Sequence, residues 1–130
     1  MSGEEKRRVL VVDDFATMRR VVKNLLQELG YKAIREAEDG GQAKGMLEEG
    51  SFDLVVLDWN MPGTPGIDVL RWVRSHESVS SLPVLMVTAE ATREQIIEAA
   101  ELGVNAYILK PFTAETLRKK LDFIFSRIAG

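Results

Sequence analysis

The chain has 130 residues, of which 45% are hydrophobic and 28% charged, and its formal net charge is −3. This length fits one compact domain, and the composition is that of a folded globular protein, which excludes intrinsic disorder and collagen-like or coiled-coil repeats. The slight acidic excess gives no basic footprint for binding nucleic acid. Cysteine is absent, which excludes disulfides and thiolate chemistry and fits a reducing compartment.

The polar amino terminus and the short apolar runs bear on location. Residues 1–8 are mostly charged or polar, and the apolar runs behind them are too short for a signal peptide or a membrane span. We therefore expect a cytoplasmic, monomeric protein with a single domain over residues 1–130. Residues 1–7 are expected to be flexible, and no output domain is expected to follow.

Five short apolar stretches alternate with longer segments along the chain. Four of them are almost continuously apolar, which is typical of parallel strands covered on both faces. The expected strands cover residues 9–12, 33–36, 54–57, 84–87 and 106–109.

The segments between these strands repeat hydrophobic residues at helical spacing. The pattern is clearest from Met18 to Leu29, ends at Gly30, and returns over residues 117–128. Shorter and less regular helices are expected at 42–49, 67–74 and 92–102. Alternating strands and helices indicate repeated βαβ units. We expect an α/β fold, a three-layer, doubly wound (βα)5 arrangement around a parallel five-stranded sheet.

Polar side chains follow four of the five expected strands. In an open parallel sheet, ligands bind outside the carboxyl ends of the strands, so these side chains indicate the site. They are Asp13 and Asp14 after the first strand, Asp58 after the third, Thr88 after the fourth and Lys110 after the fifth.

Three carboxylates at one edge raise one another's pKa unless a cation neutralises them. Oxygen ligands favour Mg²⁺, and the lack of Cys or nearby His disfavours zinc. A carboxylate can also act as a nucleophile and carry a phosphoryl group, and Asp58 is the candidate. Mg²⁺ on one side, with Lys110 and Thr88 on the other, could stabilise the charge that develops in such a transfer.

Four short motifs occur in order along the chain: VVDD at 11–14, DWNMP at 58–62, VTAE at 87–90 and KPF at 110–112. Together they resemble the receiver domain of two-component response regulators, and most closely the single-domain receivers of chemotaxis, over about residues 8–128. The resemblance implies a flavodoxin-like sheet with strand order 2-1-3-4-5 and a cis peptide between Lys110 and Pro111. It also implies a signalling switch whose only chemistry is phosphotransfer to itself and autodephosphorylation.

The resemblance assigns a role to each matching residue. Asp58 would accept a phosphoryl group from a histidine kinase, and Asp13, Asp14, Asp58 and the backbone carbonyl of Asn60 would hold one Mg²⁺. Thr88 and Lys110 would bind the phosphoryl oxygens. Asn60 and Glu90 would tune hydrolysis of the acyl phosphate, and Thr88 and Tyr107 would form the conformational switch.

Output is expected through the face built by helix 92–102, strand 106–109 and helix 117–128. Ile96 and Ile97 are adjacent, so they point about 100° apart on a helix, and one apolar stripe can bury one of them more easily than both. The partner face implied is Ala91, Arg93, Gln95, Ile96, Tyr107 and Lys120. The implied partners are a chemotaxis-type histidine kinase and the flagellar motor switch protein, with no nucleic acid and no membrane insertion. Whether a dedicated phosphatase also acts on the chain stays open.

One residue departs from the receiver pattern, and the basic clusters have an ordinary explanation as surface residues. Pro65 stands where receivers usually have Asp before the glycine, which puts the local turn in doubt. Arg19, Arg20 and the basic cluster at 118–120 are expected on solvated helix faces.

Other classes of protein fit these residues less well. A haloacid-dehalogenase-like phosphohydrolase also uses an Asp nucleophile, Mg²⁺, Thr and Lys, but it commonly places an acid/base Asp where this chain has Asn60, which cannot titrate. At 130 residues there is also no room for a cap domain. The sequence does not support a flavodoxin, because no phosphate-binding loop follows the first expected strand. It does not support a transcription factor either, because no helix-turn-helix segment is expected in it. A single-domain receiver in a phosphorelay other than chemotaxis stays open.

Overall fold

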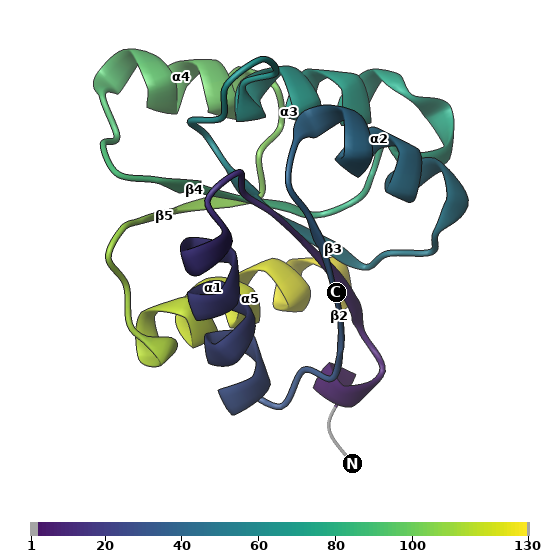
Figure 1. The fold of residues 1–130 in the computed structure, drawn as a ribbon, viewed down its shortest axis with the longest axis vertical. Coiled ribbons are helices and arrows are strands. Elements are labelled where there is room, and N and C mark those ends of the chain that lie inside the picture. The colour runs from purple at the N-terminus through teal and green to yellow at the C-terminus, as the bar shows by residue number, and fades with distance from the viewer. Residues whose placement is uncertain (1–2, 130) are drawn as a thin grey trace.

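The structure, a computed structural model, describes residues 3–129 as a five-stranded parallel sheet between two layers of helices (Figure 1). The sheet order is β2-β1-β3-β4-β5, so the predicted fold class and strand order are confirmed. The strands are β1 (Arg8–Val12), β2 (Ala33–Ala37), β3 (Leu54–Asp58), β4 (Val84–Thr88) and β5 (Ala106–Leu109). The helices are α1 (Ala16–Glu28), α2 (Gly40–Glu49), α3 (Gly66–Ser75), α4 (Arg93–Glu101) and α5 (Ala114–Ala129), with short 3-10 turns at Gly3–Glu5 and Glu77–Val79.

The two faces of the sheet each contribute to a separate apolar layer. Figure 1 shows α2, α3 and α4 on one side of the sheet and α1 and α5 on the other. Alternate residues of β1 follow this division: Leu10 and Val12 pack in the first layer, Val9 and Val11 in the second. Because both faces are covered, β3 and β4 are buried along their whole length. This explains why their sequences read as continuous apolar runs.

Local signals define the helix ends. Gly30 follows α1 with a φ of 101°, a left-handed conformation that glycine adopts without strain. The side chain of Thr92 accepts a hydrogen bond from the amide of Gln95, whose own side chain returns to Thr92, so α4 begins with a capping box. These signals place the turns that lead back to the sheet.

Arg74, near the end of α3, connects this helix to the loops that precede β4 and β5. Its half-buried guanidinium donates to the carbonyl of Gly103 (2.8 Å), the carbonyl of Leu82 (2.7 Å) and Oδ1 of Asn105 (2.9 Å). Burial lowers the pKa of this group, and these hydrogen bonds to carbonyl and amide oxygens compensate for the lost contact with water. The contacts fix the entrances to β4 and β5 at the edge opposite the polar cluster.

The residues before β1 make defined contacts within the described part of the chain. Residues 1–2 of the segment expected to be flexible lie outside the described residues. Gly3–Glu5 form a 3-10 turn, and the Arg7 guanidinium lies 3.8 Å from the ring centroid of Phe125 on α5. None of the helices within residues 3–129 has the length and apolar character needed to cross a membrane.

Candidate functional site

Three carboxylates meet at the carboxyl ends of β1 and β3, which are neighbours in the centre of the sheet. Asp13 and Asp58 are each only 3% exposed, whereas Asp14 is exposed. Each offers one oxygen, and these oxygens all lie within 4.8 Å of one another. The strand order therefore brings together residues 45 positions apart, as the sequence predicts.

Lys110 supplies a positive charge to this cluster from the end of β5. Its Nζ lies 2.8 Å from Oδ1 of Asp58 and 3.8 Å from Oδ2 of Asp13. The backbone amide of Lys110 donates to the carbonyl of Thr88 (2.8 Å), and the Lys110–Pro111 peptide is cis, as the resemblance implies. The strand end thus aims the ammonium at both buried carboxylates.

The charge balance at the cluster is incomplete. Burial is the main cause that raises the pKa of both Asp58 and Asp13, and Lys110 opposes the increase at each. The buried Oδ1 of Asp58 makes no hydrogen bond of good geometry within residues 3–129, although the Lys110 ammonium is in ion-pair range. One ammonium faces three carboxylates, so the cluster carries excess negative charge.

This donor set fits a hard divalent cation. The ligands are carboxylate oxygens, one of them on the exposed Asp14, so that bound water could complete the coordination shell of Mg²⁺. A cation would also offset the carboxylate repulsion and give Asp58 Oδ1 a further partner. Asn60, whose carbonyl the resemblance adds to the set, is exposed two residues after Asp58.

Asp13 is held in place on every side. Its amide donates to the carbonyl of Ala37 on β2 (3.1 Å), and its Oδ1 accepts from the amide of Phe15 (2.9 Å). Its carbonyl accepts from the Nη1 of Arg19 at 2.8 Å. Arg19 was expected on a solvated face, and this expectation is wrong: the side chain is only 15% exposed and also pairs with Glu36. The sequence alone does not distinguish the largely buried Arg19 from the exposed Arg20, because the two residues are identical and adjacent.

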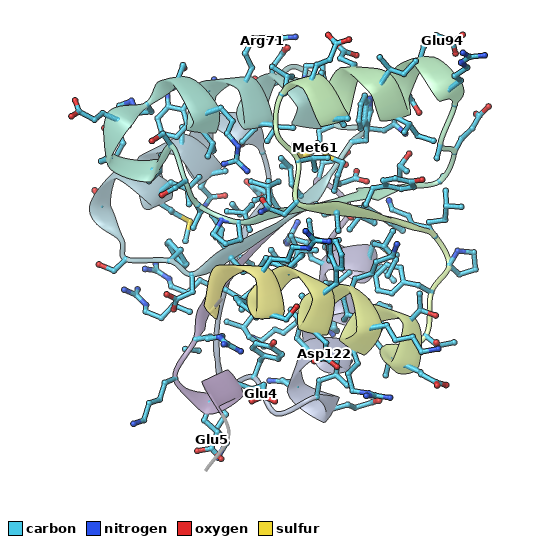
Figure 2. The ribbon with its side chains drawn as sticks, turned by 180° about the vertical axis from the view of Figure 1, so that it is seen from behind. Glu4, Glu5, Met61, Arg71, Glu94 and Asp122 are labelled. Carbon is cyan, nitrogen blue, oxygen red and sulfur yellow. The ribbon has the colours of Figure 1, made fainter. Side chains whose placement is uncertain are left out.

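The loop after Asp58 packs tightly against the first turn of α3. The amide of Gly66 donates to the carbonyl of Trp59 at 2.9 Å, and Pro65 precedes the helix with a φ of −59°. Pro65 therefore suits its position, since proline fixes φ near this value. Figure 2 shows Met61 of this loop between the helical layer and the sheet, while Arg71 and Glu94 lie on the outer surface.

Gly66→Ala should lower the free energy of unfolding by about 3 kcal/mol. A Cβ at Gly66 would meet the backbone carbonyl of Asp58 and would lie 2.9 Å from the Cα of Trp59. Urea denaturation measures the effect. Gly45→Ala is the matched control, because a Cβ there meets nothing within 4 Å and alanine should stabilise α2 by up to about 1 kcal/mol. Equal stability of the two variants would contradict the close packing at Gly66.

Thr88, the last residue of β4, is buried and bonded to the loop that follows. Its Oγ1 donates to the carbonyl of Glu90 (2.9 Å) and accepts from the Glu90 amide (3.2 Å). Glu90 itself is exposed at the same edge of the sheet. The hydroxyl thus links the strand end to the β4–α4 loop.

Tyr107 lies in the middle of β5 beside a small apolar cavity. The cavity, about 10 Å³ in volume, is lined by Thr88, Ala91, Gln95, Ile96, Tyr107, Trp59 and Ala99. This volume holds about one water molecule and cannot take a phenol ring. On its outer side, the Tyr107 ring has the Nζ of Lys120 at 5.4 Å from its centroid.

The residues expected to form the partner face are brought together around Tyr107, with one exception. Ala91, Gln95 and Ile96 line the cavity, and Lys120 lies on the other side of the ring. Arg93 is exposed at the start of α4 and does not line the cavity. Of the two isoleucines, Ile96 is half-buried and Ile97 is 46% exposed, so α4 turns Ile97 outward.

The fold and this arrangement of side chains agree with the family comparison. Residues 9–122 match the response regulator receiver domain, and the chain therefore belongs to that family, whose members act as signalling switches. This assignment excludes the haloacid-dehalogenase alternative.

Individual relatives are similar over nearly the whole chain. It is 62% identical to the chemotaxis protein CheY-3 of Vibrio cholerae over 121 residues, which is 93% of each chain. It is 58% identical to the chemotaxis protein CheY of Pseudomonas aeruginosa over 123 residues, 95% of this chain and 99% of that protein. Among solved structures, CheY4 of Vibrio cholerae is 34% identical with a TM-score of 0.85, covering 91% of this chain and 98% of that one.

Proposed function

We propose that this chain is a chemotaxis response regulator that accepts a phosphoryl group on Asp58 and then binds a protein target. The observation that carries the proposal is the buried Asp58 carboxylate, grouped with Asp13 and Asp14 and contacted by Lys110 at 2.8 Å. The similarity to relatives named as chemotaxis proteins supports the pathway.

The phosphoryl donor is a phosphohistidine of a chemotaxis-type kinase. A carboxylate oxygen of Asp58 forms a bond to phosphorus as the phosphorus–nitrogen bond breaks, and the imidazole leaves with the electron pair and takes up a proton. Asp13, Asp14, Asp58 and the carbonyl of Asn60 would hold Mg²⁺, which neutralises charge on the phosphoryl oxygens when bound. Lys110 and Thr88 bind those oxygens from the other side.

Hydrolysis and output use neighbouring residues. Asn60 and Glu90 are exposed beside the cluster, where they can influence the approach of water to the acyl phosphate. Thr88 and Tyr107 link the phosphoryl group to the partner face. The target is the flagellar motor switch protein, the relay takes place in the cytoplasm with the chain as a monomer, and a phosphatase would shorten the signal.

Phosphotransfer from radiolabelled kinases tests this function. We expect the host's chemotaxis kinase to label the chain within seconds in the presence of Mg²⁺, and EDTA to abolish the labelling. Asp13→Ala should slow labelling by at least about tenfold, because it removes a buried ligand. Labelling by a different histidine kinase alone would move the protein to another phosphorelay, and no labelling by any kinase or by acetyl phosphate would refute the proposal.

A further inference from the structure

We propose that Arg19 is a positioning residue for the cation site, which it serves by holding the backbone of Asp13. This inference rests on the proposed function, because it concerns the Mg²⁺ that accompanies phosphorylation. It adds a residue that touches neither the cation site's carboxylates nor the phosphoryl group.

The guanidinium of Arg19 connects three separate segments. It projects from the first turns of α1, donates through Nη1 to the carbonyl of Asp13 at 2.8 Å, and donates through Nε to Oε1 of Glu36 on β2 at 3.2 Å. The planar fork of arginine can make both bonds from one fixed position, which a lysine ammonium cannot do in the same way.

Strand β2 thereby supports Asp13 from two directions. The carbonyl of Ala37 accepts from the Asp13 amide, and Glu36, the preceding residue, anchors the arginine that binds the Asp13 carbonyl. Glu36 also has Lys23 of α1 at 3.6 Å, so its carboxylate is fixed between two cations of one helix. Both peptide groups flanking Asp13 are therefore held before any cation arrives.

This support matters because the carboxylates repel one another. One carboxylate oxygen from each of Asp13, Asp14 and Asp58 lies within 4.8 Å of the others. Within the described residues, Lys110 supplies the one ammonium in ion-pair range of the buried Asp13 and Asp58 carboxylates. Without the bond to Arg19, the β1–α1 loop can relax away from β3. Binding of Mg²⁺ would then have to restore the loop, and its affinity would fall.

A positioning role and a purely electrostatic role predict opposite results. Arg19 carries a positive charge near the site, so removing that charge alone would tighten the binding of a divalent cation. Removing the bond that holds the Asp13 carbonyl would weaken it. Mg²⁺ affinity of the phosphate-free protein therefore separates the two roles, and a merely structural role would change the unfolding midpoint without changing affinity.

The experiment is a titration of the native protein with Mg²⁺ alone, followed by Trp59 fluorescence in a Trp72→Phe background and repeated by calorimetry. We expect Arg19→Met to raise the dissociation constant for Mg²⁺ about tenfold, which is the scale found when a residue supporting a metal ligand is removed. Arg20→Met is the matched control, since Arg20 is exposed at the next position of α1; it should leave the constant unchanged or slightly lower.

Arg19→Lys keeps the charge and is the second variant should Arg19→Met not fold. It should give an intermediate constant, because one ammonium cannot bind both Glu36 and the Asp13 carbonyl with the same geometry. Phosphorylation by acetyl phosphate should then need more Mg²⁺ for half-maximal rate but reach a near wild-type rate at saturation. The inference is overturned if Arg19→Lys matches the wild type, or if Arg19→Met matches Arg20→Met or binds more tightly. A wild-type protein without any Mg²⁺ response would instead refute the proposed function.

Discussion

Asp58→Asn should abolish phosphorylation by acetyl phosphate and by the kinase, with a loss of at least about a thousandfold in the rate of acyl-phosphate formation. The amide of asparagine has no carboxylate oxygen to attack phosphorus, and we expect Asp13 and Asp14 to bind the cation instead of the phosphoryl group. Asp13 is held by hydrogen bonds to its carbonyl and to its Oδ1, and Asp14 is exposed at the edge of the cluster. Mass spectrometry of the intact protein and of its peptides measures the modification by acetyl phosphate and by the kinase.

The same substitution should leave the protein folded and more stable by about 1 kcal/mol at pH 7 without Mg²⁺, because it removes one of three carboxylates that repel one another. Burial raises the pKa of Asp58, so the native state favours the protonated form and loses stability as the pH rises above the ordinary value of the group. Asparagine does not ionise, so the gain should be larger at pH 7 than near pH 4. Denaturant unfolding at both pH values measures it.

Asp122→Asn is the matched control for both measurements. It makes the same change of carboxylate to amide at an exposed position on α5 (Figure 2). We expect it to leave phosphorylation and stability close to those of the wild type. A phosphoryl group mapped to Asp13 or Asp14 in the Asp58→Asn protein would contradict the assignment of the nucleophile.

The sequence predicts most of the fold because its signals are local and consistent. Continuous apolar runs predicted β1, β3 and β4 within one residue at each end, since burial on both faces allows almost no polar residue inside these strands. The helices 42–49 and 67–74 proved to begin at Gly40 and Gly66. Glycine is a poor helix former, so a sequence pattern alone places these starts too late.

The candidate site was predictable where residue type and strand position coincide. Asp13, Asp58, Thr88 and Lys110 each follow an apolar run, and parallel strands bring their ends to one edge. The contact between Arg19 and the Asp13 carbonyl was not predictable, because it depends on the angle at which α1 leaves β1. The need for glycine at position 66 was likewise hidden, since the backbone of Asp58 creates it.

A second prediction concerns the coupling between phosphorylation of Asp58 and binding at the partner face. We expect beryllofluoride to raise affinity for an amino-terminal peptide of the flagellar motor switch protein by about tenfold, a usual size for coupling between two sites. Thr88→Ala should reduce that gain to about twofold or less, while peptide affinity of the unmodified protein stays nearly the same. Fluorescence anisotropy of a labelled peptide measures both affinities.

The reason lies in the contacts of Thr88 and in the space beside Tyr107. The Thr88 hydroxyl bonds both the carbonyl and the amide of Glu90, so we expect that turning it toward a phosphoryl oxygen would release the β4–α4 loop. The cavity between that loop and Tyr107 is about 10 Å³, too small for the ring. We therefore expect Tyr107 to move inward only when the loop moves, and its ring then to move away from Lys120.

Two further variants distinguish this route from another path across the sheet. Thr88→Ser keeps the hydroxyl and should retain most of the gain, whereas Tyr107→Ala should lose most of it although Asp58 remains fully modified. Because coupling is reciprocal, the peptide should also strengthen beryllofluoride binding by the same factor in the wild type and by less in Thr88→Ala. If Thr88→Ala and Tyr107→Ala both kept the full gain, the coupling through Thr88 and Tyr107 would be wrong. The other loop beside Asp58, residues 59–65, would then be the route to test, because the carbonyl of Trp59 accepts a hydrogen bond from the amide of Gly66 at the start of α3.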